Sequence, residues 1–545
     1  MASHAKAAKS ASKNPRRSKR GGSSGVPPTR SSHDAGGAAA VPSAGVAPGS
    51  PKVTIRFYCQ GIGDCHLLKF RKDGGGDFWM LIDCGIHSSI SGGTQKIIDI
   101  VKNIRSLTTR LDVLVLTHEH WDHNSGFLAA QEEFQGIDVG EVWLGWTENP
   151  HDLQARQLDK FKGAALNALK QANEQLDRTN GLGPHLSAIK EGVQAVLGFN
   201  FGAKGEKVRS AREAAIALAK GPPKYLEPKT PPISLPELAK SVRIYVLGPP
   251  RDAAMLGLTE QASEMYGLGA AAGWPLARAL ANALGISDAG SGPDLTAPFD
   301  PNEGRDPLFL RSADLSASTD EKLKETAKFL HDFYDGPAVL PQPKEKNQGK
   351  APDPNETDQS WRRIDHDWLG VSADLAIQLD DRTNNSSLVL AFEFLDTRRV
   401  LLFVGDAQIG NWLSWEKVSW TGDPTTAADL LHRTVFYKVG HHGSHNATAK
   451  QHGLELMTSP DLSAFIPTNE QDAKKVKWGA MPFKPILEDL EKRTSQRVIR
   501  ADDLWLTQPE GKPAYSSPSG AILATRHGAF GAGASKTSWV ELDIA

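Results

Sequence analysis

The sequence predicts an α/β fold in which one core of strands and helices is interrupted by two mostly helical insertions. Strand-like apolar runs fill residues 52–149, 236–251 and 370–545, which we assign to the core. Amphipathic helical segments and Gly-, Pro- and Asp-rich stretches fill residues 150–235 and 252–369, which we assign to the insertions. With 545 residues and 39% apolar side chains, the chain is long enough to bury such a core.

The first part of the core alternates short strands with tight turns. Strands are expected at Val53–Cys59 and Cys65–Phe70, on either side of "QGIGD", and at Phe78–Ile82, which ends at "DCG". A helix follows, because apolar residues recur at helical spacing along one face: Ile97, Ile98, Val101 and Ile104. The apolar run "LDVLVLT" then predicts a buried strand.

The first insertion is expected to be helical. Leu158, Phe161, Ala165 and Leu169 form one apolar stripe, and "EKVRSAREAAIALAK" is a second amphipathic segment. The core strand "VRIYVLGPP" separates it from the second insertion, where "EKLKETAKFLHDFY" predicts one helix. Strand-like patterns then return in seven places: "ADLAIQL", "SSLVLAFEF", "RRVLLFVGD", "TVFYKVGHHGS", "LSAFIPT", "AILATRH" and "SWVELDIA".

Residues 1–51 have a different composition from the rest of the chain. Ala, Ser, Gly and Pro make up 33 of the first 50 residues, and the segment contains "NPRRSKR". Such a segment cannot bury enough apolar surface to order itself, so it is expected to be a disordered basic tail. A weak electrostatic contact with nucleic acid is the alternative interpretation of its charge.

Charge, cysteine content and hydropathy limit the class of protein. The formal net charge of −2 excludes a general attraction for polyanions. Three cysteines, an odd number without zinc-type spacing, argue against a disulfide framework and favour a reducing compartment. Neither a transmembrane run of 18 apolar residues nor an apolar signal core is visible, so a cytoplasmic protein without membrane contact is expected.

The stretch "THEHWDHNSGF", residues 117–127, carries three histidines and an aspartate within six positions. His118 and His120 alternate at the end of a strand, so both project the same way and can chelate one ion. Asp122 and His123 follow on the loop and can reach a second ion. Imidazole and carboxylate ligands suit Zn²⁺, Mn²⁺ or Fe²⁺. In the alternative interpretation these histidines only cap the strand.

Two later stretches offer the further ligands that a two-metal site needs. "RRVLLFVGDAQ" is an apolar strand that ends in Gly405-Asp406, which places a carboxylate on a sharp turn. "VFYKVGHHGSHNAT" is another strand and ends in His441-His442. Alone, the Gly-Asp pair is weak evidence, because many such pairs are only turn formers, and the His-His pair is moderate evidence. Together with the first cluster they predict a centre for two divalent ions, with Zn²⁺ favoured over Mn²⁺.

These residues carry a resemblance to a known family. "THEHWDHNSGF", "LIDCG", "FVGDAQ" and "KVGHHGSHNAT" together resemble the metallo-β-lactamase fold superfamily. Within it, "QGIGD", "NNSSLVL" and "HHGS" are similar to the branch typified by the hydrolase domain of the DNA-uptake protein ComEC. The likeness covers about half of the chain. It implies an αββα sandwich with the metals at one edge of the β layers.

The resemblance also implies roles for the residues. His118 and His120 would hold the first metal, and Asp122 and His123 the second. Asp406 would bridge the two, and one of His441 and His442 would complete the second site. Asp83, in "LIDCG", would orient the ligand loop by hydrogen bonding or lie near the metals; otherwise it is a strand-terminal turn residue.

The sequence departs from the family pattern at the first metal. Many members carry a further histidine before the bridging aspartate, and His151 is the nearest candidate here. Relatives in the branch often carry Gly-His-Pro near the C-terminal helix, whereas this chain has "WGAMPFKP". The first metal is therefore expected to be ligand-poor, weakly held or absent.

The leading functional hypothesis is a metal-dependent hydrolase that uses a metal-activated hydroxide. Asp122 would accept the proton of the water, and Asp406 would be the second catalytic carboxylate. Lys438, Ser444, His445 and Asn385 are expected to support the site or contact an anionic substrate. The resemblance favours a phosphodiesterase or nuclease acting on a small anionic molecule or single-stranded nucleic acid. The alternatives are an ester, lactone or amide hydrolase, and a catalytically silent metal-bound interaction module.

The insertions lead to a separate hypothesis. Long connections in compact domains often serve as active-site lids, and the first insertion begins soon after the histidine motif. Residues 150–235 and 252–369 are therefore expected to form a helical cap that narrows access to the metals. In the alternative they pack on the far side of the core as a platform for a protein partner.

Overall fold

The structure is a computed structural model, and within it one compact unit spans Gly49–Ala545. The described residues are 50–178, 184–195, 197–198, 206–258, 261, 263–264, 319–334, 371–476, 481–507, 515 and 517–545. The predicted tail lies outside them except for its last two residues, and so does most of the second insertion.

The first sheet has eight strands in the order β13-β14-β1-β2-β3-β4-β5-β6. Pairing is antiparallel from β13 to β3 and parallel from β3 to β6. The strands are β1 (Val53–Cys59), β2 (Cys65–Arg71), β3 (Asp77–Cys84), β4 (Arg110–Val115), β5 (Asp138–Gly145), β6 (Lys224–Leu226), β13 (Ile522–Phe530) and β14 (Thr537–Ile544). The first sheet therefore combines both ends of the described chain.

The second sheet has six strands in the order β12-β11-β10-β9-β8-β7. The pairs from β7 to β9 are antiparallel, and those from β9 to β12 are parallel. The strands are β7 (Val242–Gly248), β8 (Val389–Phe394), β9 (Val400–Phe403), β10 (Thr434–Lys438), β11 (Ser463–Ile466) and β12 (Val498–Arg500). Because β9 and β10 are parallel, their carboxyl ends lie at the same edge.

The main hydrophobic core lies between the two sheets. Phe57 of β1 stacks on Phe436 of β10 and Phe465 of β11, with ring centroids 5.2 and 4.3 Å apart. Along β10, Phe436 belongs to this core, whereas its neighbour Tyr437 belongs to the cluster on the outer face of the second sheet. This alternation is the two-residue period expected of a strand with apolar neighbours on both faces.

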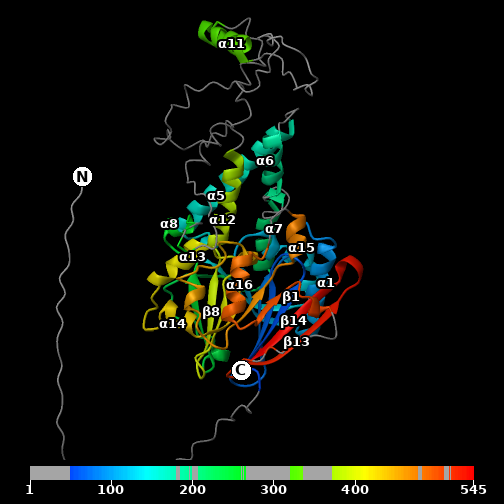
Figure 1. The fold of residues 1–545 in the computed structure, drawn as a ribbon, viewed down its shortest axis with the longest axis vertical. Coiled ribbons are helices and arrows are strands. Elements are labelled where there is room, and N and C mark those ends of the chain that lie inside the picture. Colours follow the sequence, from blue (N-terminus) through cyan, green and yellow to red (C-terminus); the bar gives the residue numbers. More distant parts are fainter. Residues whose placement is uncertain are drawn as a thin grey trace, which may run out of the picture. The chain divides into compact units, whose positions relative to one another are not determined.

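Helices cover both outer faces (Figure 1). On the first sheet, α1 (Gly93–Leu107) buries Ile97, Ile100, Val101 and Ile104. Short helices α2 (Trp121–Asn124), α3 (Gly126–Ala129) and α4 (Gln131–Phe134) follow β4. On the second sheet lie α13 (Ile409–Ser414), α14 (Ala427–His432) and α16 (Lys484–Arg493); α15 (Glu470–Lys475) follows β11. The predicted α/β fold with two facing sheets and helices outside is confirmed.

The segments assigned to the insertions contain several helices. They are α5 (Leu153–Arg178), α6 (Pro184–Ala195), α7 (Glu206–Ile216), α8 (Ala253–Leu256) and α11 (Glu321–Tyr334). Helices α5 and α6 pack with α12 (Val371–Asn385) around one apolar cluster that includes Leu169, Val193 and Leu379. Of the predicted stripe, Ala165 and Leu169 lie inside this cluster and Phe161 packs against it. None of the helices in the described part of the chain combines the length and apolarity needed to cross a membrane.

The strand predicted from "ADLAIQL" is wrong, because these residues lie in helix α12. In a strand, Leu375, Ile377 and Leu379 would share one face. In the structure Leu375 and Leu379 are buried one helical turn apart, whereas the side chain of Ile377 is 56% exposed. The period is therefore helical, and the apparent alternation came from a single exposed isoleucine.

Candidate metal centre

The first two histidines of the motif follow β4 and face each other. The distance between His118 Nε2 and His120 Nδ1 is 3.0 Å. Two nitrogens that bind one tetrahedral ion at 2.0–2.1 Å would lie about 3.3 Å apart, so this pair has nearly the spacing of two ligands. Burial lowers the pKa of His118 well below its usual value and that of His120 to about 3. Both rings are therefore neutral, as metal ligands must be.

A second group of potential ligands has enough members to hold an ion without the first pair. Asp122, His123, Asp406 and His442 are all buried, and one ligand atom of each lies within 4.8 Å of the others. His442 Nε2 lies 2.8 Å from Asp122 Oδ2 and 3.4 Å from Asp406 Oδ2. His123 Nε2 lies 3.2 Å from the same Asp406 oxygen. Two imidazoles and two carboxylates in this arrangement fit a divalent transition metal ion.

The turn after β9 brings Asp406 to the centre. Gly405 has φ = 55°, and a Cβ there would lie 2.9 Å from Cβ of Thr117, so a larger residue does not fit. The Asp406 N–H donates to Ser387 Oγ, and Asp406 Oδ1 accepts the His441 N–H at 2.9 Å. Burial would raise the pKa of Asp406, but His123, His442 and Lys438 lower it well below its usual value.

The two adjacent histidines after β10 point in different directions. Both have positive φ, 40° for His441 and 54° for His442. The His442 ring joins Asp122 and Asp406, whereas Nδ1 of His441 lies 2.7 Å from Ser444 Oγ and 3.1 Å from Gln408 Nε2. Of the two, the geometry therefore places His442 in the cluster.

Asp83 orients the motif from behind. It has φ = 55°, and its carboxylate accepts the backbone N–H of Thr117 at 2.8 Å and the Thr117 hydroxyl at 2.6 Å. Its Oδ2 also lies 2.8 Å from Nδ1 of His123. A carboxylate at Nδ1 leaves Nε2 of His123 as the atom facing Asp406, which is the usual arrangement behind a metal-binding histidine.

Sequence reasoning missed Asp64, the last residue of "QGIGD". Asp64 and Lys438 are both buried and form an ion pair, and Lys438 also donates to the carbonyl of Gly405 at 2.9 Å. Although burial alone would raise the pKa of Asp64, Lys438 lowers it to about 2. The preceding Gly63 lets the chain pass close to the motif, since it has φ = 124° and a Cβ there would lie 2.6 Å from the Asp122 carbonyl oxygen.

Other predicted residues lie apart from the two groups of ligands. Ser444 contacts Asn446 as well as His441, and the half-buried His445 packs edge-on against Phe483. Asn385 fixes the chain around α13: its Nδ2 donates to the Leu258 carbonyl, and its Oδ1 accepts N–H groups of Gln408 and Asn411. His151 is exposed in the turn before α5 and is absent from the described clusters of potential ligands.

Residues of the helical segments contact the histidine motif itself. Glu119, which lies between His118 and His120 in the sequence, forms ion pairs with Lys162 of α5 and Arg212 of α7. Burial opposes its ionisation, but these two cations lower the pKa of Glu119 below its usual value. On the other side, Asp380 Oδ1 of α12 lies 3.4 Å from His120 Nε2. Neither Glu119 nor Asp380 could be recognised from the motif alone.

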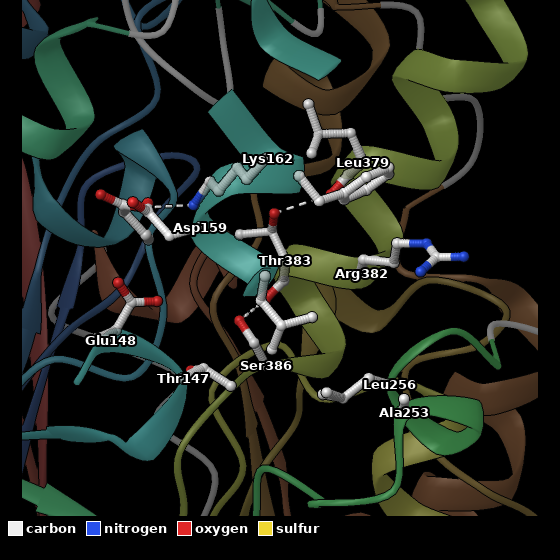
Figure 2. A pocket seen from close by; sticks show the side chains of 13 residues that line it. Thr147, Glu148, Asp159, Lys162, Ala253, Leu256, Leu379, Arg382, Thr383 and Ser386 are labelled. Carbon is white, nitrogen blue, oxygen red and sulfur yellow. Dashed lines mark hydrogen bonds and ion pairs between the residues drawn. The ribbon is translucent and has the colours of Figure 1, made fainter. Parts of the chain in front are cut away.

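A cavity of about 70 Å³ adjoins Glu119 (Figure 2). Figure 2 shows that α5, α8 and α12 supply much of its walls, together with Thr147 and Glu148 from the turn after β5, and that Lys162 reaches toward the carboxylates at one side. Apolar side chains form much of the lining, among them Leu158, Phe161, Leu256 and Leu379. The helices therefore meet beside Glu119, in the loop that carries the candidate ligands His118 and His120.

One comparison with known proteins gives a match. Residues 60–158 match the family model described as the metallo-beta-lactamase superfamily. No curated protein matches the chain. The narrower likeness to the ComEC-like branch stays a prediction. The matched stretch holds Asp64, Asp83 and the whole histidine motif, at the carboxyl end of β4. Residues 60–158 therefore carry a metallo-beta-lactamase superfamily domain, and the later part of the chain adds Asp406 and His442 to its cluster of potential metal ligands.

Proposed function

We propose that the protein is a hydrolase that works with two divalent metal ions. The observation that carries this proposal is the buried group of Asp122, His123, Asp406 and His442 beside the facing pair His118 and His120. Proteins of this superfamily are commonly metal-dependent hydrolases, and the residues fit such ions in number, chemistry and spacing.

The proposed division of the ligands follows the distances. His118 and His120 hold the first ion, and Asp122, His123 and His442 hold the second. Asp406 would contribute to the second, because its carboxylate faces His123 and His442, and the family resemblance assigns it a share in the first as well. Zn²⁺ is the favoured metal for imidazole-rich ligands, with Mn²⁺ as the alternative.

Bound ions of this kind supply Lewis acidity, which lowers the pKa of water and offsets negative charge on substrate oxygens. The chain's own residues then have separate tasks. Asp122 stays ionised, because His123 and His442 lower the pKa of its carboxyl against the effect of burial. In this form it can accept a hydrogen bond from the water and orient it. Asp83 holds His123 in one tautomer. Lys438 neutralises the negative charges of Asp64 and Asp406 within the protein, so we do not propose that it binds the substrate.

The proposed substrate is a phosphodiester, either a small anionic molecule or single-stranded nucleic acid. The support is the resemblance of "QGIGD", "NNSSLVL" and "HHGS" to the ComEC-like branch. One observation favours the ester, lactone or amide alternative: Lys438, the buried cation nearest the cluster, is already paired with carboxylates. A phosphodiester would therefore depend mainly on the ions for charge neutralisation.

A substrate panel tests the function. Protein purified without added metal is expected to hold about two ions per chain and to hydrolyse bis-p-nitrophenyl phosphate faster than p-nitrophenyl acetate. The double variant His120→Ala/Asp122→Ala should lose both metal and activity while keeping its circular dichroism spectrum. Preference for the acetate would select the ester alternative. One ion or none, with neither activity, would contradict the hydrolase and favour a silent interaction module.

A further inference from the structure

Glu119 occupies an unusual place in the motif. In the sequence it lies between His118 and His120, whose rings face each other. Its side chain is buried, at 3% exposed, and its carboxylate is held by side chains of α5 and α7. Both cations that neutralise Glu119, Lys162 and Arg212, come from the first insertion. The insertion therefore reaches the ligand pair through the residue between them.

The charges around Glu119 form a buried network. Arg212 lies 3.3 Å from Glu119 and 2.5 Å from Glu148, and the side chains of Lys162 and Arg212 are only 14% and 17% exposed. Burying several charges costs desolvation free energy, so such a network is poor evidence for stability. Its clearer effect is geometric. Lys162 donates a hydrogen bond to Glu119, and Arg212 donates one to Glu148 while lying beside Glu119, so the Glu119 carboxylate is held toward α5 and α7.

The opposite side of the ligand pair meets α12, the helix that follows the second insertion. Nδ1 of His120 faces His118, and Nε2 faces Asp380 Oδ1 at 3.4 Å. The other Asp380 oxygen accepts from Asn384 Nδ2, which also lies 3.2 Å from His441 Nε2. At this distance Asp380 is an ion-pair neighbour of the His120 ring without a hydrogen bond to it. A carboxylate beside the far nitrogen of a ligand imidazole favours the tautomer and ring orientation that direct an N–H toward it.

We infer that Glu119 and Asp380 are positioning residues for His118 and His120, and that the helical segments brace the first metal site through them. This inference rests on the proposed function, because it presumes that His118 and His120 hold an ion. We call the contacts of Glu119 with Lys162 and Arg212, and of Asp380 with His120, the brace. By holding His118 and His120 in place, the brace compensates for the lack of a third histidine ligand at the first metal site. It assigns the helices α5, α7 and α12 a task in metal binding, although none of them supplies a ligand.

The contacts differ from those of a lid over the substrate. A lid closes above the ions, whereas Lys162 and Arg212 reach the loop through the residue between the ligands. The cavity of about 70 Å³ lies beside this contact and is lined by Lys162. A methionine at position 162 therefore has room to fit, so Lys162→Met removes the charge without a clash.

The test compares metal affinity in three variants and two controls. Glu119→Gln, Lys162→Met and Asp380→Asn each remove one charge of the brace. Asp381→Asn changes the next carboxylate of α12, which accepts from Gln408 Nε2 rather than facing His120. Lys160→Met removes an exposed lysine of α5. Zn²⁺ affinities are measured on the full chain by competition with a chromophoric chelator, together with the thermal midpoint of the metal-free protein.

The expected result is a loss of about 10–100-fold in affinity for one of two ions in the three brace variants, with the other ion retained. The controls should bind both ions as the wild type does, and the metal-free midpoints of Asp380→Asn and the controls should agree with that of the wild type within a few degrees. If Glu119→Gln and Asp380→Asn bind two ions with wild-type affinity, the inference that these residues position His118 and His120 is wrong. It is also wrong if the variants lose affinity for both ions equally. A wild-type chain that binds no ion would instead overturn the proposed function, and the brace with it. If one variant fails to fold, the remaining two decide the outcome.

Discussion

Replacing Asp406 by asparagine should lower kcat at least about 100-fold. Loss of a residue that only supports a ligand costs 10–100-fold, so a carboxylate shared by both ions should cost more. The amide oxygen of asparagine can still accept the His441 N–H, so the turn should keep its conformation. Steady-state kinetics on the preferred ester, with metal content measured on the same sample, checks the prediction.

A matched control for this variant is available in the turn between β8 and β9. Asp396 is 65% exposed in its side chain and pairs with Lys52. Asp396→Asn removes the same charge from the chain, and its kcat should stay within about twofold of the wild type. Near-normal turnover of Asp406→Asn would show that Asp406 is only a turn residue and that the two-ion assignment is wrong.

Replacing Lys438 by methionine should destabilise the fold by about 3–5 kcal/mol, because it leaves buried carboxylates without their cation. Lys438 and Asp64 are both 1% exposed and pair directly, and Lys438 Nζ lies 3.5 Å from Asp406 Oδ1. Urea unfolding at pH 7, with a metal chelator present throughout, measures the decrease in the free energy of unfolding. Lys474→Met on α15 is the control, since its exposed pair with Glu470 should contribute at most about 0.5 kcal/mol.

The effect of Lys438→Met should depend on pH. Lys438 holds the pKa of Asp64 at about 2, below the value of an unfolded aspartate, against the opposing effect of burial. This pair therefore contributes stability above about pH 4 and loses it as the pH falls toward 2. The difference between wild type and variant should shrink over that range. Adding Asp64→Asn to the variant should restore part of the stability at pH 7, and a loss below about 1 kcal/mol in Lys438→Met would contradict the ion-pair account.

The sequence was sufficient to predict the candidate ligands that can be recognised from their spacing and from the strands before them. The histidine motif follows a buried strand, and both downstream ligand turns follow strands β9 and β10, so a reader of the sequence can predict that they meet. The choice between His441 and His442 could not be made. It depends on two successive residues with positive φ, a backbone conformation that no sequence period reveals.

The sequence was insufficient where contacts join distant segments. Glu119 is an ordinary glutamate until Lys162 and Arg212 are placed beside it, and Asp380 lies 260 positions beyond His120 in a segment that resembled a strand. Asp64 was overlooked for a different reason. Its motif marked a family likeness, but its partner Lys438 lies on a strand of the other sheet, and only packing brings the two together.

The central position of β1 in the first sheet has a consequence for synthesis of the chain. One edge of β1 pairs with β2 soon after both are made, but the other edge pairs with β14. Thr54 and Asp543, which hydrogen-bond across this pair, are 489 positions apart. A ribosome working at roughly 5–20 residues per second needs roughly 25–100 s to cover that distance. Throughout that time the nascent chain exposes the edge of β1, a row of unpaired backbone groups open to wrong partners and to chaperones.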